Sequence, residues 1–395
     1  MGLAMQILIT IPSIGSVYGG PSKSVCELAQ ALGYQGAIVD LVTTDANGPN
    51  KLDLPLQTWL DRPNYRLQIF PAQVWGDYKW STLLAQWLSH KLHYYDAVHI
   101  NAVFSLTSLP FYWYCNRRQV PYIIAPRGTL EPWALAYKAQ KKRLYYQLFE
   151  RPALNRASAI QALASTEAEN IAPLGLSAPV VTIPNGIHRQ DFASPGNPNL
   201  FYQQFPHTQG KTLIFFLGRL DPKKGLDQLA PAFAQVQAKF PHTHLILAGP
   251  DNVGFLPTAQ QYFAEAGCKH ATTFTGLLTG DLKRAALAAA NLYVAPSYSE
   301  GFSMSVLEAM ATGLPCVITT GCNFPEAAQV NAARVVDIQP NAIADALIEY
   351  LSDLSAAKAM GARARQFVLD NYTWDKVAAN LIEVYQAILQ QAPLP

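Results

Sequence analysis

The chain has 395 residues, of which 50% are hydrophobic and 14% are charged, and its formal net charge is +2. This length predicts two or three domains with buried cores, and the small net charge argues against nucleic acid as the main partner. The five cysteines include no Cys-x-x-Cys pair, which predicts reduced thiols in a cytoplasmic protein.

The first half begins with an apolar run, Met5 to Ile11, that predicts a β-strand. No basic region precedes the run, so it is not typical of a signal peptide. The glycine loop that follows, with Gly19 and Gly20, leads into an amphipathic helix that we expect Gly33 to close. No apolar run reaches the roughly 20 residues that a membrane span needs.

Polar residues follow three further strand-like runs of this half. His99 and Asn101 end the first, so their side chains should share one face. Arg127 follows the strand Tyr122 to Ala125, and Asn185 follows Val180 to Ile183. Each of three residues has a structural alternative. His99 can be a histidine at a strand end whose hydrogen bonds are made within the fold, Arg127 can pair with a structural carboxylate, and Asn185 can belong to an Asn-Gly turn. We do not assign Asn185 a catalytic role.

A basic and aromatic segment lies between these strands. Positions 138 to 156 carry six basic residues and one acid, a local net charge of +5. Three interpretations stay open: an interfacial helix on anionic lipid, a groove for a polyprenyl diphosphate acceptor, or a solvated helix with its aromatic residues packed inward. The residues concerned are Trp133, Tyr137, Lys138, Lys141, Lys142, Arg143, Tyr145, Tyr146, Phe149 and Arg151.

The second half repeats the architecture of the first. Residues 191–210 are rich in Pro, Gly, Asn and Gln and predict a linker. A strand at Thr212 to Leu217 then leads through a glycine loop into another amphipathic helix. Alternating strands and helices predict parallel sheets wound by helices in both halves, with domains at 1–190 and 211–371. Neither glycine loop is a Gly-x-Gly-x-x-Gly motif, which argues against a nicotinamide dinucleotide.

Two motifs of the second half carry the chemistry. Arg219 and Lys224, in the first strand-to-helix turn, are placed to bracket a diphosphate, although Lys224 at a helix start is also typical of a solvated charge. Glu300 and Glu308 lie on a later turn, with Glu300 on the loop and Glu308 in the helix. Either glutamate can alternatively cap the helix, because Ser297-x-x-Glu300 and Ser305-x-x-Glu308 have the capping-box spacing.

Together these motifs resemble a family. Gly218-Arg219-Leu220-Asp221 with Lys224-Gly225, and Glu300-x7-Glu308, are similar to the retaining glycosyltransferases of family 4 (group 1), which have the GT-B fold. Segments of the first half look like members that build exopolysaccharide or lipopolysaccharide. The resemblance implies two Rossmann-like doubly wound α/β domains facing across a cleft, and a C-terminal helix, 372–395, that crosses back to the first domain.

The resemblance also implies roles for the candidate residues. Arg219 and Lys224 would offset the donor diphosphate charge, Glu308 would bind the ribose, and Glu300 the donor sugar. Backbone groups of Gly19 and Gly20, and of the helix start, would approach the donor, while Asn101, Arg127 and Lys142 would line the acceptor side. The residues expected to be catalytic are Arg219, Lys224, Glu300 and His99. Relatives often carry His at both positions of the His99 and Asn101 pair, so Asn101 departs from the pattern. The helix-start residues are Gly301, Phe302, Ser303 and Met304.

We therefore expect a retaining glycosyltransferase that uses a nucleotide-sugar donor and a glycan or lipid-linked sugar acceptor in cell-surface polysaccharide synthesis. We expect no cofactor and no metal, since the chain has no Asp-x-Asp motif and no metal-ligand spacing. Peripheral contact with an anionic membrane at the inner face of the plasma membrane follows from the first interpretation of the basic segment. The alternatives are a nucleotide-sugar epimerase of the same fold and a non-catalytic nucleotide- or sugar-binding subunit.

Overall fold

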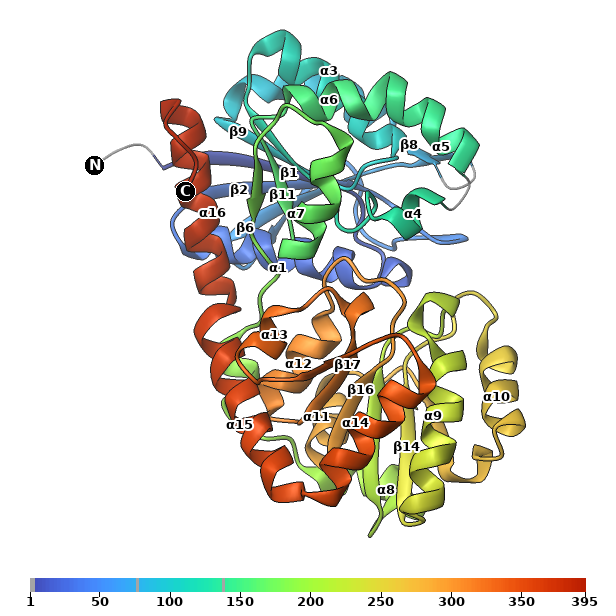
Figure 1. The fold of residues 1–395 in the computed structure, drawn as a ribbon. Helices are drawn as coiled ribbons and strands as arrows, with labels where there is room; N and C mark the ends of the chain where they lie inside the picture. Colours follow the sequence, from blue (N-terminus) through green and yellow to red (C-terminus); the bar gives the residue numbers. More distant parts are fainter. Residues whose placement is uncertain (1–3, 76–77, 137–138) are drawn as a thin grey trace. The chain divides into compact units, whose positions relative to one another are not determined.

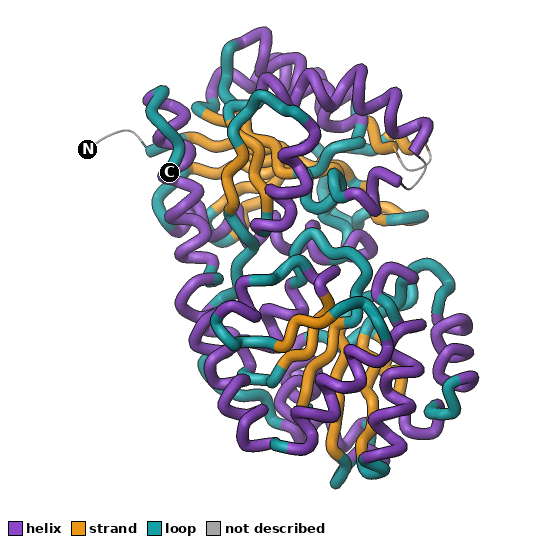
Figure 2. The backbone as a smooth tube through the Cα atoms, in the orientation of Figure 1, coloured by secondary structure: helices purple, strands orange, loops and turns teal. Residues whose placement is uncertain are grey.

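The computed structural model describes residues 4–75, 78–136 and 139–395, which form two compact units (Figure 1, Figure 2). Unit 1 comprises Met1–Gly186 and Trp374–Pro395, and unit 2 comprises Ile187–Thr373. The C-terminal helix α16 (Trp374–Gln390) therefore returns to the first unit, as the resemblance implied. The segment 191–210, expected to be a linker, instead belongs to unit 2, where its helix α8 packs on α11.

Unit 1 is built on an eight-stranded sheet. The sheet is parallel except for its edge strand β5, which pairs antiparallel with β6. In spatial order the strands are β12 (Val180–Thr182), β11 (Ala159–Ala162), β10 (Tyr122–Ala125), β9 (Ala97–Asn101), β1 (Gln6–Ser13), β2 (Ile38–Thr44), β6 (Tyr65–Phe70) and β5 (Trp59–Arg62). Two small antiparallel pairs lie outside this sheet, β3 (Ala46–Asn47) with β4 (Asn50–Lys51) and β7 (Gln73–Trp75) with β8 (Tyr78–Trp80).

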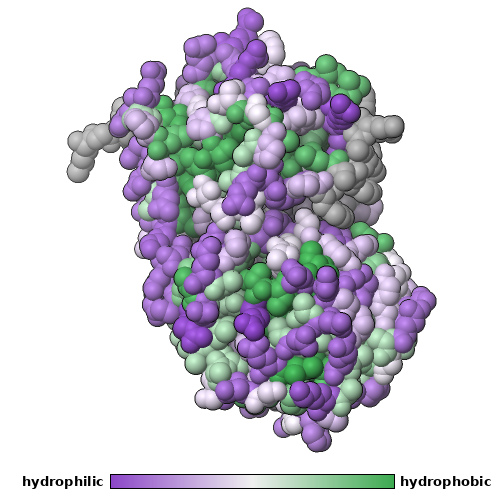
Figure 3. All heavy atoms as spheres, in the orientation of Figure 1, coloured by the Kyte–Doolittle hydropathy of each residue, from purple (hydrophilic) through white to green (hydrophobic). Residues whose placement is uncertain are grey.

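Helices cover both faces of this sheet. Helices α1 and α16 share one apolar cluster with the strands, and α2, α3, α6 and α7 share the cluster on the other face. Buried Trp374, Leu381 and Tyr385 make α16 part of the unit 1 core, while hydrophilic residues follow its outward side in Figure 3. The helices are α1 (Gly20–Tyr34), α2 (Thr82–Lys91), α3 (Leu109–Arg118), α4 (Pro132–Ala136), α5 (Ala139–Tyr145), α6 (Arg151–Arg156) and α7 (Ser165–Ile171).

One glycine of unit 1 has a different role from the one expected. Gly33 lies inside α1, which continues to Tyr34, and so does not close the helix. A Cβ at Gly33 would lie 1.7 Å from the backbone oxygen of Asn64. The residue is therefore needed because the helix backbone passes very close to the turn before β6, and not because the chain must leave the helix there.

Unit 2 is built on a six-stranded, wholly parallel sheet. Its spatial order is β15 (Thr272–Gly276), β14 (Thr243–Ala248), β13 (Thr212–Leu217), β16 (Leu292–Ala295), β17 (Cys316–Thr319) and β18 (Arg334–Val336). The helices are α8 (Pro198–Gln204), α9 (Leu226–Lys239), α10 (Leu256–Glu265), α11 (Gly280–Ala289), α12 (Met304–Thr312), α13 (Glu326–Gln329), α14 (Pro340–Ser352) and α15 (Leu354–Asn371). Both units thus have the doubly wound α/β architecture expected from the sequence.

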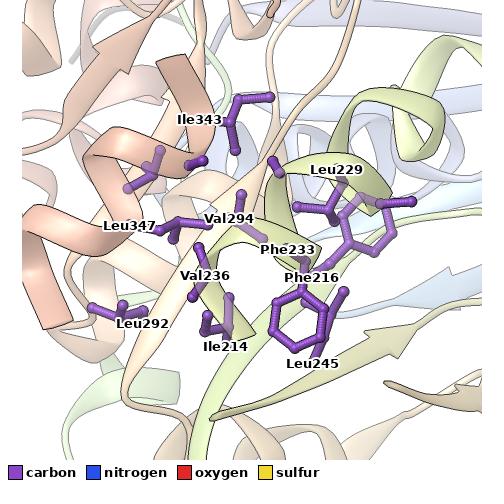
Figure 4. Packing of buried hydrophobic residues seen from close by; sticks show 14 of the residues in the cluster. Ile214, Phe216, Leu229, Phe233, Val236, Leu245, Leu292, Val294, Ile343 and Leu347 are labelled. Carbon is purple, nitrogen blue, oxygen red and sulfur yellow. The ribbon is translucent and has the colours of Figure 1, made fainter. Parts of the chain in front are cut away.

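The core of unit 2 lies between its sheet and the helices α9, α10 and α14. Phe216 and Leu245 from the strands, Phe233 from α9 and Leu347 from α14 belong to one hydrophobic cluster, part of which Figure 4 shows. All four side chains are almost completely buried. This packing fixes β13 and its neighbours, so that the loops at their carboxyl ends are held in place.

Candidate active site

Two loops of unit 2 are held together at the carboxyl ends of β13 and β16. Gly225, in the loop before α9, has φ +68°, and a Cβ on it would lie 2.0 Å from the Pro296 backbone oxygen. The Tyr298 N–H donates to the Lys223 carbonyl oxygen at 2.8 Å. Loops that follow neighbouring parallel strands form the usual ligand-binding edge of such a sheet. The two motifs found in the sequence therefore meet at that edge.

Lys224 and Glu300 form an ion pair where these loops meet. The Lys224 Nζ donates to Glu300 Oε1, which also accepts from the Ser297 Oγ at 2.8 Å. The two side chains are only 12% and 9% exposed. Burial acts to raise the pKa of Glu300, but the charges of Lys224 and Lys223, with these hydrogen bonds, hold it below its ordinary value. Glu300 is therefore an ionised carboxylate with a fixed orientation.

Glu308 forms a second ion pair, with a lysine that the sequence analysis did not select. The Lys283 Nζ, from α11, lies 2.8 Å and 3.0 Å from the two Glu308 carboxylate oxygens. Glu308 is the fifth residue of α12 and so lies in the helix, as expected. Ser303, and not Ser305, is the N-cap residue of this helix, so the capping-box alternative for Glu308 is wrong. The serine of the earlier spacing, Ser297, donates to the Glu300 carboxylate instead of beginning a helix.

Arg219 lies on the same loop as Lys224 but is not paired. Among the residues that the structure describes, its half-buried guanidinium has no hydrogen-bond or ion-pair partner. Burial lowers the pKa of neighbouring Lys223, whose position is less favourable for charge. Arg219 is thus a cation at the ligand-binding edge, and no residue of the described ranges places a counter-charge in contact with it.

The start of α12 also faces this edge of the sheet. The N-cap residue Ser303 makes no side-chain capping hydrogen bond, and Gly301 and Met304 beside it are partly exposed. The Phe302 side chain is buried against Phe324 and Tyr372, so its ring is structural and only its backbone is available. A helix start without a side-chain cap attracts anions through its free N–H groups and its dipole.

In unit 1, the glycine loop ends at a helix start of the same kind. Gly19 is the N-cap residue of α1, with φ +75° and no side-chain capping hydrogen bond. A Cβ at Gly20 would meet no heavy atom within 4 Å. Gly19 is therefore required for its backbone conformation, whereas Gly20 leaves open space beside the first turn of α1.

Arg127 is the centre of a buried polar network in unit 1. Its guanidinium donates to the Asn101 Oδ1 at 2.8 Å, the Ser24 Oγ at 3.0 Å and the Asn185 Oδ1 at 3.2 Å. Burial lowers the pKa of Arg127 to about 10, while the charge of Glu167 acts to raise it. The arginine thus joins α1 to the ends of β9, β10 and β12, and its three hydrogen bonds are all to neutral oxygens.

His99 is completely buried and contacts the C-terminal helix. Its Nδ1 lies 2.7 Å from the Tyr385 hydroxyl of α16. Burial, together with the charge of Arg127, lowers the pKa of His99 to about 3, so the imidazole is neutral. Its Nε2 has no hydrogen-bond partner within the described part of the chain. His99 in this environment holds α16 against the sheet and cannot carry charge at neutral pH.

The basic and aromatic segment lies on α4, α5, a π-helix at Tyr146–Glu150, and α6. The Lys142 Nζ donates to the Ala134 carbonyl oxygen at 2.5 Å and lies 5.4 Å from the centre of the Phe104 ring. Leu144, Leu148 and Phe149 are exposed by 64%, 59% and 44%. The predictions for Tyr137 and Lys138, and for the side chains of Trp133 and Lys141, fall outside the described residues.

Sequence reasoning missed Glu150 as well as Lys283. Glu150 is fully buried and accepts from the Phe104 N–H at 2.7 Å and the Tyr112 hydroxyl at 2.9 Å. Burial raises its pKa to about 7, although both hydrogen bonds act to lower it. The sequence did contain a signal for Lys283. A lysine as the fourth residue of a helix is disfavoured by the helix dipole, which indicates that its charge is stabilised by a contact outside the helix.

Neither a metal cluster nor a membrane-spanning helix is found in residues 4–75, 78–136 and 139–395. No three His, Cys, Asp or Glu side chains there come together as metal ligands. No helix in the same ranges is long and apolar enough to cross a bilayer. Of the five cysteines, which form no disulfide, four are buried.

Each half of the chain matches a glycosyltransferase family model. Residues 19–186 match the glycosyl transferase 4-like domain, and residues 200–367 match glycosyl transferases group 1. The chain belongs to the group 1 glycosyltransferases. The two matches together span most of the chain and correspond closely to units 1 and 2.

Curated relatives of this group 1 glycosyltransferase match over part of its length. It is 32% identical over 179 residues to a GDP-mannose-dependent alpha-(1-6)-phosphatidylinositol monomannoside mannosyltransferase of Mycobacterium tuberculosis. That alignment covers 43% of this chain and 46% of the relative. The chain spans about half the length of the curated relatives it matches.

Solved structures share the fold of this group 1 glycosyltransferase over nearly its whole length. A sucrose-phosphate synthase from Thermosynechococcus elongatus has a TM-score of 0.77 at 20% identity, with 98% of this chain and 100% of that chain covered. The Anabaena protein HepE, solved in complex with UDP and glucose, has a TM-score of 0.76 at 19% identity, with 97% and 100% covered. At these identities the likeness establishes the GT-B fold.

Proposed function

We propose that this chain is a retaining, metal-independent glycosyltransferase that transfers a sugar from a nucleoside diphosphate sugar to a glycan or lipid-linked sugar acceptor. The observation that carries the proposal is the meeting of two loops of unit 2, which places unpaired Arg219, the Lys224–Glu300 pair and the start of α12 at one edge of the sheet. Cations and free helix N–H groups are what a diphosphate needs when no metal binds it.

The Lys224–Glu300 ion pair describes the site before the donor binds. In the proposed complex, Lys224 turns from the carboxylate to the diphosphate, and Glu300 accepts hydrogen bonds from hydroxyls of the donor sugar. The ionised state of Glu300 supports this role, because a carboxylate accepts hydrogen bonds strongly. Arg219 supplies the charge that stabilises the leaving phosphate, and Glu308 binds the ribose.

Unit 1 supplies the acceptor side in this proposal. The helix start at Gly19 and Gly20 has no side-chain cap, and the network of Asn101, Arg127 and Asn185 shapes the ends of the strands. The buried neutral imidazole of His99, whose Nδ1 lies 2.7 Å from the Tyr385 hydroxyl, is unsuited to proton transfer at neutral pH. In place of the catalytic role that the resemblance implied, we propose that His99 is a structural residue that holds α16.

The proposed reaction proceeds at one face of the sugar. The bond between the anomeric carbon and the diphosphate oxygen breaks, and the same face of the anomeric carbon bonds to the acceptor oxygen. The acceptor proton passes to the departing phosphate oxygen, so no protein base is required. The sugar has oxocarbenium character between these events. A product of inverted anomeric configuration, observed by NMR, would refute the retaining assignment.

A thermal-shift screen tests the proposed function directly. Purified protein is heated with UDP, GDP, ADP or CDP and their common sugar conjugates, first without metal and then with Mg²⁺. A ligand at 100 times its Kd stabilises the native state by about 2.7 kcal/mol, so the donor class should stand out. A shift that appears only with Mg²⁺ would contradict metal independence, and the absence of any shift would count against a nucleotide-sugar enzyme.

Turnover separates the transferase from its two alternatives. A nucleotide-sugar epimerase would convert the donor without an acceptor, whereas a non-catalytic subunit would bind the donor and release no nucleoside diphosphate. We expect nucleoside diphosphate release that depends on added acceptor, and Lys224→Met should abolish it. Membrane extracts and lipid-linked oligosaccharides are the appropriate acceptor pools, because we propose cell-surface polysaccharide synthesis on the cytoplasmic side.

We also propose that unit 1 contacts anionic membrane through residues 142–151. Exposed Leu144, Leu148 and Phe149 lie beside exposed Arg143, a combination suited to the interface between lipid head groups and acyl chains. Sedimentation with liposomes tests this. Binding should require anionic lipid and should weaken in Leu144→Ser/Leu148→Ser. Equal binding to neutral vesicles, or no binding, would favour a solvated helix.

A further inference from the structure

Glu150 is a buried carboxylate that directly follows exposed apolar residues of unit 1. Leu148 and Phe149, immediately before it, are exposed, whereas Glu150 itself is completely buried. Its Oε1 accepts from the Phe104 N–H at 2.7 Å, and its Oε2 accepts from the Tyr112 hydroxyl at 2.9 Å. The proposed reaction does not use this carboxylate. Glu150 therefore joins the exposed segment to α3 and to the loop that follows β9.

The local sequence explains why Glu150 points inward. The helical run from Ala139 to Arg156 contains a π-helical turn, Tyr146–Glu150, between α5 and α6. Pro152 accounts for this turn, because a proline inside a helix has no N–H to donate and its ring crowds the carbonyl group of Leu148, four residues earlier. A wider turn relieves the crowding, and such turns occur often at functional sites.

The loop that Glu150 holds has an unusual backbone. Ala102 and Phe104 have φ +82° and +60°, a region that residues with a Cβ rarely adopt. Such a conformation persists only where the surrounding structure holds it. The Phe104 ring also lies 6.1 Å and 6.4 Å from the rings of Tyr145 and Tyr146, so the same helical run holds this residue through its backbone and its side chain. The loop can therefore relax to ordinary φ values when this hold is released.

The same loop continues directly from the acceptor side of the proposed function. Strand β9 ends at Asn101, which accepts from the Arg127 guanidinium. The Ala102 N–H then donates to the Ala125 carbonyl oxygen of β10 at 3.0 Å, and the Ala102 carbonyl oxygen accepts from the Ser108 hydroxyl at 3.3 Å. The conformation of the loop thus shapes the carboxyl ends of β9 and β10.

We propose that Glu150 is a positioning residue that couples contact between residues 142–151 and an anionic bilayer to the conformation of the loop 102–105. The inference rests on the membrane contact in the proposed function and deepens it. In the free protein the exposed segment opens locally, and each opening removes the acceptor of the Phe104 N–H. A bilayer that holds Leu144 and Leu148 makes such openings rarer. The acceptor-side loop is then fixed where a lipid-linked acceptor is present.

Hydrogen–deuterium exchange with and without lipid tests the coupling. Wild-type protein is measured alone, with vesicles of phosphatidylglycerol and phosphatidylcholine, and with neutral vesicles of phosphatidylcholine. Sedimentation of the same mixtures reports binding separately. We expect the anionic vesicles to slow exchange of the amides of 142–149. They should also slow exchange at 102–108 about tenfold, the effect of one hydrogen bond to a charged group.

Glu150→Leu removes the acceptor and leaves the exposed leucines in place. We expect this variant to sediment with anionic vesicles as the wild type does, while the vesicles change exchange at 102–108 by less than about twofold. Glu150→Gln keeps an oxygen that accepts from the Phe104 N–H, so it should retain part of the response. Glu150→Asp, whose shorter side chain withdraws the carboxylate, should lose the response and replaces the leucine variant if that variant does not fold.

Glu167→Leu is the matched control. Glu167 is also completely buried and also accepts backbone N–H groups, from Gly128 and Leu163, but it holds a different loop of unit 1. This control should keep the wild-type response at 102–108. A wild-type response in Glu150→Leu would overturn the proposal, because the carboxylate would then be unnecessary. A lost response in Glu167→Leu would also overturn it, because any loosening of unit 1 would then suffice.

Failure of this inference is distinguishable from failure of the proposed function. If the wild-type protein binds anionic vesicles without a change at 102–108, only the coupling through Glu150 is refuted. If it binds no vesicles, the proposed membrane contact fails and the coupling fails with it. Nucleotide binding by unit 2 does not depend on either result, and the thermal-shift screen tests it separately.

Discussion

Replacing Lys224 with methionine removes the main counter-charge of Glu300 and leaves its carboxylate buried. The Glu300 side chain is 9% exposed, and without Lys224 its carboxylate keeps the Ser297 hydroxyl and the more distant charge of Lys223. Removing one member of a buried pair typically costs about 3–5 kcal/mol, because the remaining charge is left without compensation. Since Lys223 still provides some compensation, we expect a loss near the lower figure, about 3 kcal/mol, in the stability of unit 2.

The double variant Lys224→Met/Glu300→Gln removes both charges. Ser297 can still donate to the new amide oxygen, so we expect a total cost of about 1 kcal/mol, less than that of Lys224→Met alone. The two substitutions should therefore couple by about 2 kcal/mol or more. Lys358→Met, which removes an exposed charge from the same unit, should leave stability within about 0.5 kcal/mol of the wild type.

Optical probes can assign the loss to unit 2. All seven tryptophans of the chain fall within unit 1, at positions 59, 75, 80, 87, 113, 133 and 374. Urea unfolding followed by tryptophan fluorescence therefore reports unit 1, whereas far-UV circular dichroism reports both units. We expect Lys224→Met to shift the dichroism transition and leave the fluorescence transition in place. Purely additive effects of the two substitutions would refute the argument from an uncompensated buried carboxylate.

Three further perturbations test other parts of the structure. Glu150→Gln should flatten the pH dependence of the free energy of unfolding of unit 1. The pKa of Glu150 is about 7 in the folded state against an ordinary 4.5, so wild-type stability falls by about 1.4 kcal/mol per pH unit as pH rises between these values. An unchanged slope in tryptophan-monitored unfolding would contradict this pKa. Gly225→Ala should destabilise unit 2 by at least about 2 kcal/mol, because the new Cβ would clash with the Pro296 backbone oxygen and the residue has a positive φ. The control Gly210→Ala, at φ +79° with open space around it, should cost only the backbone strain of about 1–2 kcal/mol. Arg219→Ala should lower kcat about 10²- to 10³-fold without changing the unfolding curves, and equal kcat in the variant would remove Arg219 from the mechanism.

The sequence predicted most of the fold because its apolar runs are short and clearly bounded. The strands expected at Thr212 to Leu217 and at Tyr122 to Ala125 are β13 and β10 with the same ends. The segment 191–210 shows the opposite case. Its composition is typical of a linker, yet α8 within it packs on α11, a contact between distant segments that composition does not encode.

The candidate site was only partly predictable for the same reason. The motifs located Lys224 and Glu300, but they suggested separate contacts with the donor, whereas the two side chains are partners across 76 residues of sequence. The environment of His99 depends on Tyr385, which lies 286 residues away in a helix whose apolar pattern indicates only an amphipathic surface. Side-chain partners between elements depend on how these elements pack, and periodicity within one element does not specify them.

The division of unit 1 into two stretches of chain also has a consequence for protein synthesis. Trp374, Leu381 and Tyr385 of α16 complete the apolar cluster that covers one face of the unit 1 sheet, yet 187 residues of unit 2 are translated between that sheet and this helix. During synthesis, the face of the sheet that carries Ile7 and Ile9 therefore stays uncovered until α16 leaves the ribosome. A nascent chain arrested before residue 374 should present this face to chaperones, even where unit 2 has already folded.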